Sequence, residues 1–194
     1  MSLGEQRELR DPRTMRALAH PLRLSLFELV MREGSLTSTQ ASELTGESTG
    51  TCSFHLRQLA KYGFLEDAPG GKGRERPWRA VGISLGWSAV QEDAATAEAA
   101  NALSDLMLDR RLRDLEAFLR RRANESEEWR EASLSMGNLL YLRPEELTRV
   151  SKQIVDLLRP YGERTRDASQ RPPDARAVQL FAYGFPLPPT ATGN

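Results

Sequence analysis

The sequence contains few of the residues that form disulfides or bind metals. Among its 194 residues there is one cysteine, Cys52, and there are two histidines, His20 and His55. A single cysteine cannot form a disulfide within the chain, and three such side chains cannot complete a four-ligand Cys/His zinc site. Zinc fingers and disulfide-stapled secreted modules are therefore excluded, and we expect neither a metal nor a cofactor.

Long apolar runs and internal repeats are also missing. Nowhere do about 18 apolar residues follow one another, and the first 13 residues are charged and lack the apolar centre of a signal peptide. We therefore expect a cytoplasmic protein without a membrane partner. No repeat of about 20 to 50 residues is visible, which excludes solenoids and propellers. No nucleophile with its base, phosphate loop or metal set is visible either, so we do not expect an enzyme.

The chain carries no excess charge of one sign, with 27 basic and 27 acidic residues. The total is an average over two unlike halves. Residues 1–88 hold 12 basic and 10 acidic side chains, whereas 89–194 hold 15 and 17. Within 68–80, four basic residues stand against Glu75 alone. Because phosphate binding depends on a local excess of Lys and Arg, a nucleic-acid partner is still compatible with the neutral total.

The first 34 residues predict two short helices. Asp11 precedes Pro12, and His20 precedes Pro21, so each pair places a proline in the first turn of a helix. Gly34 is expected to end the second helix. The apolar face of this second helix consists of Leu22, Leu24, Leu26, Phe27, Leu29 and Val30.

Two further helices are expected before residue 63. Thr37 and Gln40 have the spacing of a capping box at the start of a short helix that Gly46 ends. The next helix is expected over about 48–62. Residues 64–68 and 76–83 then predict the strands of a hairpin with a glycine-rich turn at 69–73. Short helices followed by a basic hairpin are typical of compact DNA-binding proteins.

The helix at 48–62 carries the most informative pattern. Cys52, Leu56 and Leu59 share one face, which leaves polar residues on the others. A helix whose first turn is small and polar can enter the major groove, about 12 Å wide, without steric conflict. The free backbone N–H groups of that turn also favour a phosphate.

Three segments in this order, MRALAHPLRLSLFELV, TCSFHLRQLAKYGFLE and GGKGRERPW, resemble the winged helix-turn-helix of the ArsR-type (arsenic-repressor-like) bacterial regulators. The resemblance covers roughly residues 12–83. It implies a homodimeric transcriptional regulator whose recognition helices enter successive major grooves of double-stranded DNA. The DNA-reading positions of that family fall on Ser48, Thr49, Thr51, Ser53, Phe54 and Arg57, and the wing positions on Lys72, Arg74 and Arg76.

The sequence departs from the metal-sensing members of that family. It has no CxC pair and no C-terminal His/Asp set, so metal sensing is not expected. Its C-terminal part is also longer than the single closing helix of a minimal member. We predict a helix at 89–122 with Ser88 as its cap, a strand at 131–142, a helix from Pro144, a polar linker at 164–174 and a strand at 177–185. The long helix bears Leu108, Leu112, Leu115 and Leu119, and the later one bears Leu147, Val150, Ile154 and Leu157 as its buried stripe.

The predicted fold class is mainly α with small β (α+β): a winged helix-turn-helix, a long helix and a small α/β C-terminal unit. We divide the chain into a DNA-binding domain at 1–86, a dimerisation or effector region at 87–185 and a disordered tail at 186–194. The predicted function is a sequence-specific repressor with its wing at 69–79. The alternative is a protein-interaction module that uses the helix at 89–122 as its partner surface.

Several residues have two interpretations. Arg57 could read a guanine or hold a phosphate, and Phe54 could contact a thymine methyl group or pack beneath the wing. His55 suits a structural histidine bonded to backbone better than a base contact or a proton switch. Cys52 suits the core better than an exposed redox thiolate.

The second half of the chain leaves further choices. The leucines at 108–119 suggest a helix interface, between subunits or back onto the winged domain. Glu145 and Glu146 could be a catalytic carboxylate pair, but the helix dipole accounts for both. Aromatic residues could line the pocket of a small-molecule effector or form an ordinary core. These are Phe118, Trp129, Tyr141, Tyr161, Phe181 and Tyr183.

Overall fold

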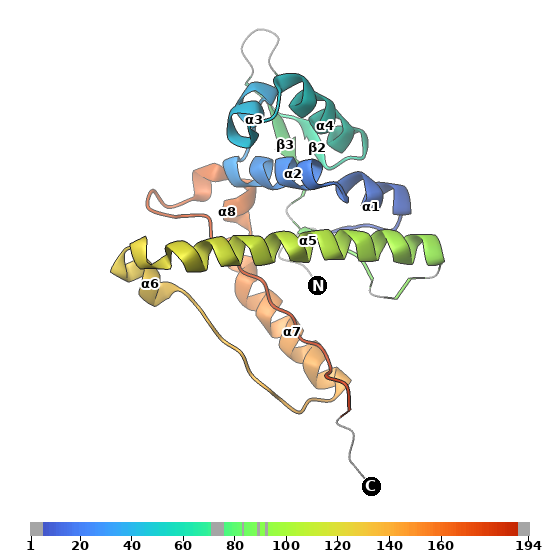
Figure 1. Ribbon diagram of the computed structural model, residues 1–194, viewed down its shortest axis with the longest axis vertical. Helices are drawn as coiled ribbons and strands as arrows, with labels where there is room; N and C mark the ends of the chain where they lie inside the picture. The colour runs from blue at the N-terminus through green and yellow to red at the C-terminus, as the bar shows by residue number, and fades with distance from the viewer. Residues whose placement is uncertain (1–5, 71–75, 83, 89, 92, 190–194) are drawn as a thin grey trace.

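The chain folds into a mainly helical structure with little β-sheet. The computed structural model describes residues 6–70, 76–82, 84–88, 90–91 and 93–189. In these residues the order is β1, α1 to α4, β2 to β4 and α5 to α8, with 3-10 turns after α5, α7 and α8 (Figure 1). The predicted fold class, a winged helix followed by a long helix, is confirmed.

The first four helices are α1 (Pro12–Leu18), α2 (Pro21–Glu33), α3 (Ser38–Thr45) and α4 (Thr49–Lys61). Their caps confirm the sequence pattern. The Asp11 carboxylate accepts hydrogen bonds from the backbone N–H groups of Arg13 and Thr14, at 3.2 and 3.0 Å. Thr37 and Gln40 form the expected capping box. Each cap satisfies N–H groups that have no partner within the helix.

The wing consists of β2 (Leu65–Asp67) and β3 (Trp78–Ala80), which pair antiparallel. Leu36 adds a short bridge, since its N–H and C=O both bond the backbone of Trp78 at 2.9 Å. The returning strand is shorter than the predicted 76–83, since its ladder with β2 spans only 78–80. The next strand, β4 (Ser84–Gly86), pairs in parallel with β1 (Gln6–Glu8), a strand that the sequence did not predict. The turn at 71–75 lies outside the described residues.

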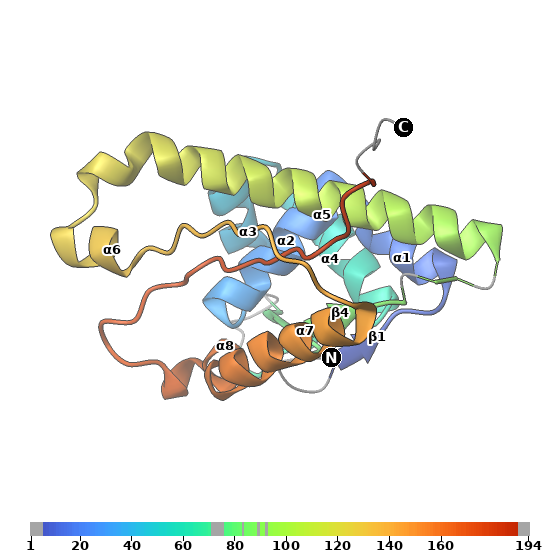
Figure 2. The ribbon, with the colours of Figure 1, turned by 90° about the horizontal axis from the view of Figure 1, so that it is seen from below.

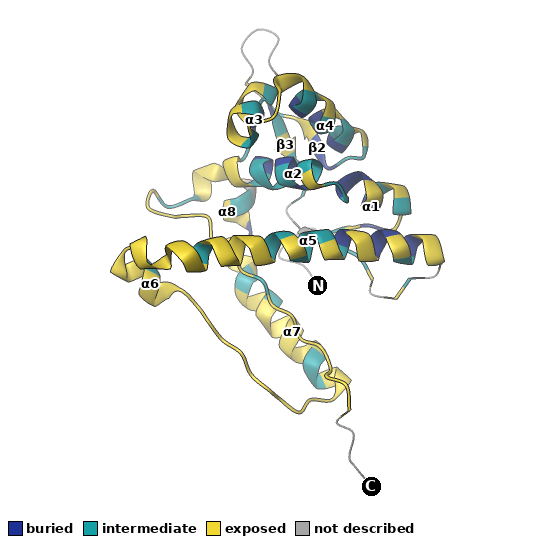
Figure 3. Cartoon of the chain, in the orientation of Figure 1, coloured by how far each residue is buried: buried dark blue, intermediate teal, exposed yellow. Residues whose placement is uncertain are grey.

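The hydrophobic core lies between α1, α2, α4 and the wing (Figure 3). Phe27 of α2 meets Phe64 edge-on, with 5.8 Å between the ring centroids. Burying each large apolar side chain of this kind contributes about 1.5 to 3 kcal/mol to stability. The largest fully buried members are Phe64, Met15, Leu18, Leu24, Leu26, Leu56, Leu59, Leu103 and Val30.

Helix α5 (Ala94–Arg121) connects this core to the rest of the chain. It begins after Asp93, whose carboxylate accepts a hydrogen bond from the N–H of Thr96 at 2.9 Å. The predicted cap at Ser88 is wrong, because that hydroxyl accepts instead from the N–H of Val90. Figures 1 and 2 show α5 crossing beneath α1 and α2. Its first half buries Ala99, Ala100 and Leu103 in the core.

The C-terminal part contains α6 (Glu127–Ala132), α7 (Pro144–Leu158) and α8 (Glu163–Arg166). The predicted strands at 131–142 and 177–185 are wrong, since neither segment pairs with another. The linker at 164–174 is also partly helical, through α8 and the 3-10 turn Ala168–Gln170. Residues 186–189 have no regular secondary structure, and 190–194 lie outside the described part. None of the described helices is long and apolar enough to cross a membrane.

Apolar side chains in this part are largely exposed (Figure 3). On α7 the predicted buried stripe is wrong, because none of its residues is buried and Val150, Ile154 and Leu157 are 36%, 38% and 71% exposed. Glu145 and Glu146 lie in the first turn of α7. Both contact Arg143, and Glu146 also accepts a hydrogen bond from the backbone N–H of Arg143 at 2.9 Å.

The C-terminal aromatic residues do not belong to the buried core of the described structure. Tyr141 is 95% exposed. Trp129 lies under the guanidinium of Arg176, 4.8 Å from the ring centroid. Phe181 and Tyr183 meet edge-on with 6.2 Å between centroids. Among the described residues, no large apolar side chain beyond Leu103 belongs to the buried core.

Candidate nucleic-acid interface

The turn between α3 and α4 fixes the start of the candidate recognition helix. Gly46 ends α3 with φ +75°, a conformation that side chains with a Cβ rarely adopt. The Ser42 hydroxyl donates to the carbonyl of Glu47 at 2.6 Å, which holds the turn against α3. The Ser48 hydroxyl then accepts from the N–H of Thr51 at 3.0 Å and begins α4. The angle between the two helices is therefore set by local hydrogen bonds.

Burial on one side of α4 determines which side faces solvent. Cys52, Leu56 and Leu59 are fully buried, as the sequence predicted. Gly50, Phe54, Arg57 and Lys61 lie on the opposite side, at the spacing of successive helical turns, and all four are exposed. Of the predicted site residues, Ser48 and Thr49 are exposed near this face, and Ser53 lies half-buried at its edge.

Two details of this face differ from what the sequence suggested. Thr51 lies on the flank of α4, and its hydroxyl is 2.8 Å from that of Ser48, so both take part in the cap. Lys61 was not among the predicted site residues, although its spacing of four residues from Arg57 is the signal that places it on the exposed face.

Phe54 is half exposed, and its ring meets His55 edge-on with 5.1 Å between centroids. It is not one of the partly buried side chains that pack against the core. The two interpretations of Phe54 therefore concern its exposed half alone. In one it contacts a thymine methyl group, and in the other it packs beneath the wing, whose turn lies outside the described residues.

His55 and Cys52 lie away from the exposed face. The predicted backbone hydrogen bond of His55 is wrong, because its Nδ1 is buried without a partner among the described residues. Its ring faces His20, which precedes α2. Cys52 is fully buried with its Sγ 3.5 Å from the Thr45 hydroxyl, so it lacks the exposure that a redox thiolate needs.

The described part of the wing is closer to neutral than the sequence suggested. Arg79 pairs with Glu66 across the two strands at 2.8 Å, and Arg76 lies 3.5 Å from Asp67. The window 68–80 missed both acids because they belong to the opposite strand of the hairpin. Arg76 nevertheless keeps most of its side chain exposed, at 77%. Lys72 and Arg74, the other predicted wing contacts, lie outside the described residues.

This arrangement suits a groove of DNA. The first turn of α4 presents small polar side chains and free backbone N–H groups, which attract phosphate, and Arg57 and Lys61 extend from the same helix. Within the described residues, no group of three or more His, Cys, Asp or Glu side chains could hold a metal ion.

Comparison with known proteins agrees with this geometry. A family model described as a helix-turn-helix domain matches residues 18–68, from the end of α1 to just beyond β2. No curated protein matches the chain. The matched segment contains α3, the turn and all of α4, so the two helices of the candidate interface are those of a helix-turn-helix, a domain that suggests a DNA-binding regulator.

Proposed function

We propose that the protein is a sequence-specific DNA-binding transcriptional regulator, similar to the ArsR-type repressors. The recognition helix α4 enters the major groove, and the wing at 69–79 reaches the backbone or the minor groove. The observation that carries this proposal is the division of α4 into a fully buried face (Cys52, Leu56, Leu59) and an exposed face that includes Arg57 and Lys61. The buried face packs α4 against the core, and the exposed face is left accessible to a binding partner.

The proposed contacts follow from position on α4. Ser48 and Thr51 hold the first turn and direct its N–H groups at a phosphate, while Thr49 and Ser53 flank the groove floor. Arg57, one turn beyond Ser53, has the length to reach a guanine edge. Phe54 offers an apolar ring edge to a thymine methyl group. Lys72, Arg74 and Arg76 supply the positive charge of the wing.

We further propose that the protein acts as a homodimeric repressor, which binds two half-sites and blocks the DNA that it occupies. Leu112, Leu115 and Leu119 of α5 are 44%, 39% and 53% exposed, and a second copy of α5 would cover them. In this proposal residues 1–86 bind DNA, 87–185 serve dimerisation, and 186–194 form a tail. Helix α5 joins the first two parts, because its first half packs in the core with α1.

A second candidate function is a protein-interaction module, and the same exposed leucines favour it. In that case α5 binds another protein and the winged helix serves as its scaffold. Exposed apolar surface on a helix is typical of interaction sites of either kind.

The test is a selection of the purified chain against a pool of random duplexes. Enrichment of a common sequence with two related half-sites supports the DNA-binding proposal. Binding that does not distinguish any selected duplex from random DNA favours the interaction module.

A further inference from the structure

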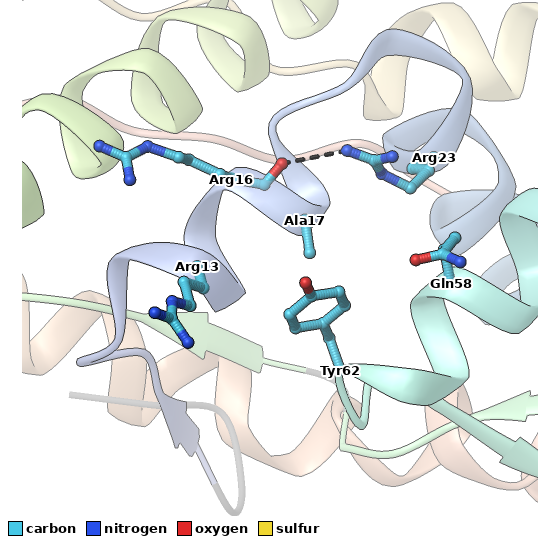
Figure 4. Close-up of a pocket in the computed structure, with 6 residues that line it drawn as sticks. All are labelled: Arg13, Arg16, Ala17, Arg23, Gln58 and Tyr62. Atoms are coloured by element: carbon cyan, nitrogen blue, oxygen red, sulfur yellow. Dashed lines mark hydrogen bonds between the residues drawn. The ribbon is translucent and has the colours of Figure 1, made fainter.

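A pocket of about 310 Å³ lies on the flank of α4 that faces α1 and α2 (Figure 4). Its volume is at the lower end of the range of small-molecule sites. Three of its lining residues are arginines from α1 and α2, while α4 supplies the amide of Gln58 and its C-cap supplies the phenol of Tyr62. The lining residues are Arg13, Arg16, Ala17, Arg23, Gln58 and Tyr62, and none of them is acidic.

The charges of this pocket are only partly compensated. Arg16 extends toward α5, where Glu98 lies 3.5 Å away. Arg13 makes no side-chain hydrogen bond or ion pair with any described residue. Its charge contributes to lowering the pKa of Asp11, which caps α1. Arg23 donates from Nη2 to the carbonyl of Arg16 at 3.1 Å, and its Nε is buried without a partner in the described structure. A buried donor without an acceptor destabilises the fold, because it has lost its hydrogen bonds to water.

Two histidines, His20 and His55, lie near Arg23. Burial lowers its pKa, yet a guanidinium stays protonated at neutral pH. Burial and the charge of Arg23 lower the pKa of His20, and the same two causes together with His20 lower that of His55, which Glu47 alone raises. The Nδ1 atoms of both histidines are also buried without partners among the described residues.

We propose that this pocket binds a small phosphate-type oxyanion in the free protein. Arg13 lies on one side of Tyr62 and Arg23 on the other, and Gln58 lies beside Arg23, so the lining residues border the pocket from several sides (Figure 4). Such a set suits the tetrahedral oxygens of a phosphate better than a planar carboxylate, which one guanidinium fork satisfies. The remaining volume accommodates a small group esterified to the phosphate.

The location gives this binding a consequence for the proposed function, on which this step rests. Gln58 lies on the flank of the recognition helix and Tyr62 is its C-cap, whereas Arg13 and Arg23 belong to α1 and α2. A bound anion therefore bridges α4 to the two helices that pack beside it. We expect it to change the affinity for DNA without occupying the groove-facing side of α4.

The direct test is an NMR titration of the full chain with inorganic phosphate and with glycerol phosphate, following the Nε–H signals of the arginines. We expect a saturable shift of the Arg23 signal with one anion per chain. Arg13→Gln should weaken the binding at least tenfold. Should that variant fold poorly, Tyr62→Phe removes one donor and should weaken binding severalfold. Chloride at equal ionic strength and acetate should give no saturable shift.

Arg57→Ala is the matched control, because it removes a cation from the same helix but outside the pocket. It should leave phosphate binding within twofold of the wild type, whatever it does to DNA binding. The proposal is wrong if phosphate gives no saturable shift, if acetate saturates the site in its place, or if Arg13→Gln binds phosphate as tightly as the wild type.

DNA backbone is the other source of the same chemistry, and a duplex titration separates the two. Without added phosphate, Arg13→Gln should bind the selected duplex within about twofold of the wild type. If it weakens binding to every duplex while the free protein ignores phosphate, the pocket is a backbone contact and the proposal is wrong. If the chain selects no DNA but binds phosphate as described, the proposed function fails and the oxyanion site stands.

Discussion

The imidazole rings of His20 and His55 lie 4.8 Å apart between centroids, with their planes inclined by 32°. His20 immediately precedes α2, and His55 lies in the middle of α4, so the pair joins the recognition helix to the helix behind it. The Nδ1 of each ring is buried without a partner among the described residues. Two rings so placed cannot both be charged without repulsion.

This pair predicts that stability falls in mild acid. Burial, with repulsion by Arg23, lowers the pKa of both histidines in the folded chain below the ordinary value of 6.5. The unfolded chain then binds more protons as the pH falls below about 6.5, so the free energy of unfolding decreases there and is constant above about 7.5. Urea unfolding at pH 7.5, 6.5 and 5.5 measures this decrease.

A control separates the histidines from the carboxylates, whose ordinary pKa values are lower. The double substitution His20→Gln and His55→Gln should flatten the profile between pH 5.5 and 7.5, whatever it does to stability at pH 7.5. An unchanged slope in the double variant would show that other groups cause the loss.

Arg57 is predicted to read a base. Arg57→Ala should cost about 1 to 3 kcal/mol of binding free energy and relax the preference at one base pair of the selected duplex. Binding to a panel of duplexes that differ at single positions measures both effects. Arg120→Ala, an exposed arginine at the far end of α5, serves as the control and should change neither. An equal loss on every duplex would make Arg57 a phosphate contact instead.

The wing is predicted to contact phosphates. Replacing Lys72, Arg74 and Arg76 together by alanine should reduce the slope of log affinity against log salt by roughly 0.9 for each lost contact. Arg79→Ala is the matched control, because Glu66 already pairs with Arg79 at 2.8 Å. Titrations at several salt concentrations give both slopes, and an unchanged slope in the triple variant would contradict the assignment of the wing.

The exposed leucines of α5 are predicted to lie in a dimer interface. Leu112→Asp with Leu115→Asp should convert a dimer into a monomer, because two carboxylates per helix would be buried against their symmetry mates. Light scattering after gel filtration measures the mass. A Leu134→Asp variant controls for added charge, since Leu134 is 71% exposed outside α5. A wild-type chain that is monomeric at micromolar concentration would contradict the dimer.

Local patterns predicted the helices of the first 62 residues because their ends are coded locally. Asp11 caps the start of α1 and Thr37 caps the start of α3, while Gly46 ends α3. Each acts through hydrogen bonds to residues only a few positions away. The buried face of α4 followed equally well from the spacing of Cys52, Leu56 and Leu59. The faces of α4 were therefore predictable before any tertiary contact was known.

Features that depend on distant partners could not be predicted in this way. The strand β1 is polar and three residues long, and it forms only because β4 lies beside it. The alternating segments at 131–142 and 177–185 lack any partner in the described structure, and a period of two specifies a strand only where a neighbour supplies hydrogen bonds. The pocket at Arg23 depends on the bend between α1 and α2, which brings together arginines from two helices.

The measurement that tests the central claim most directly is the ratio of two dissociation constants at one physiological salt concentration. One is for the duplex selected by the purified chain, and the other is for random duplex of the same length. Specific recognition through α4 predicts a ratio of at least about 1,000, the lower end of what specific DNA-binding proteins reach. A ratio within a few-fold of one would contradict sequence-specific DNA binding by this chain.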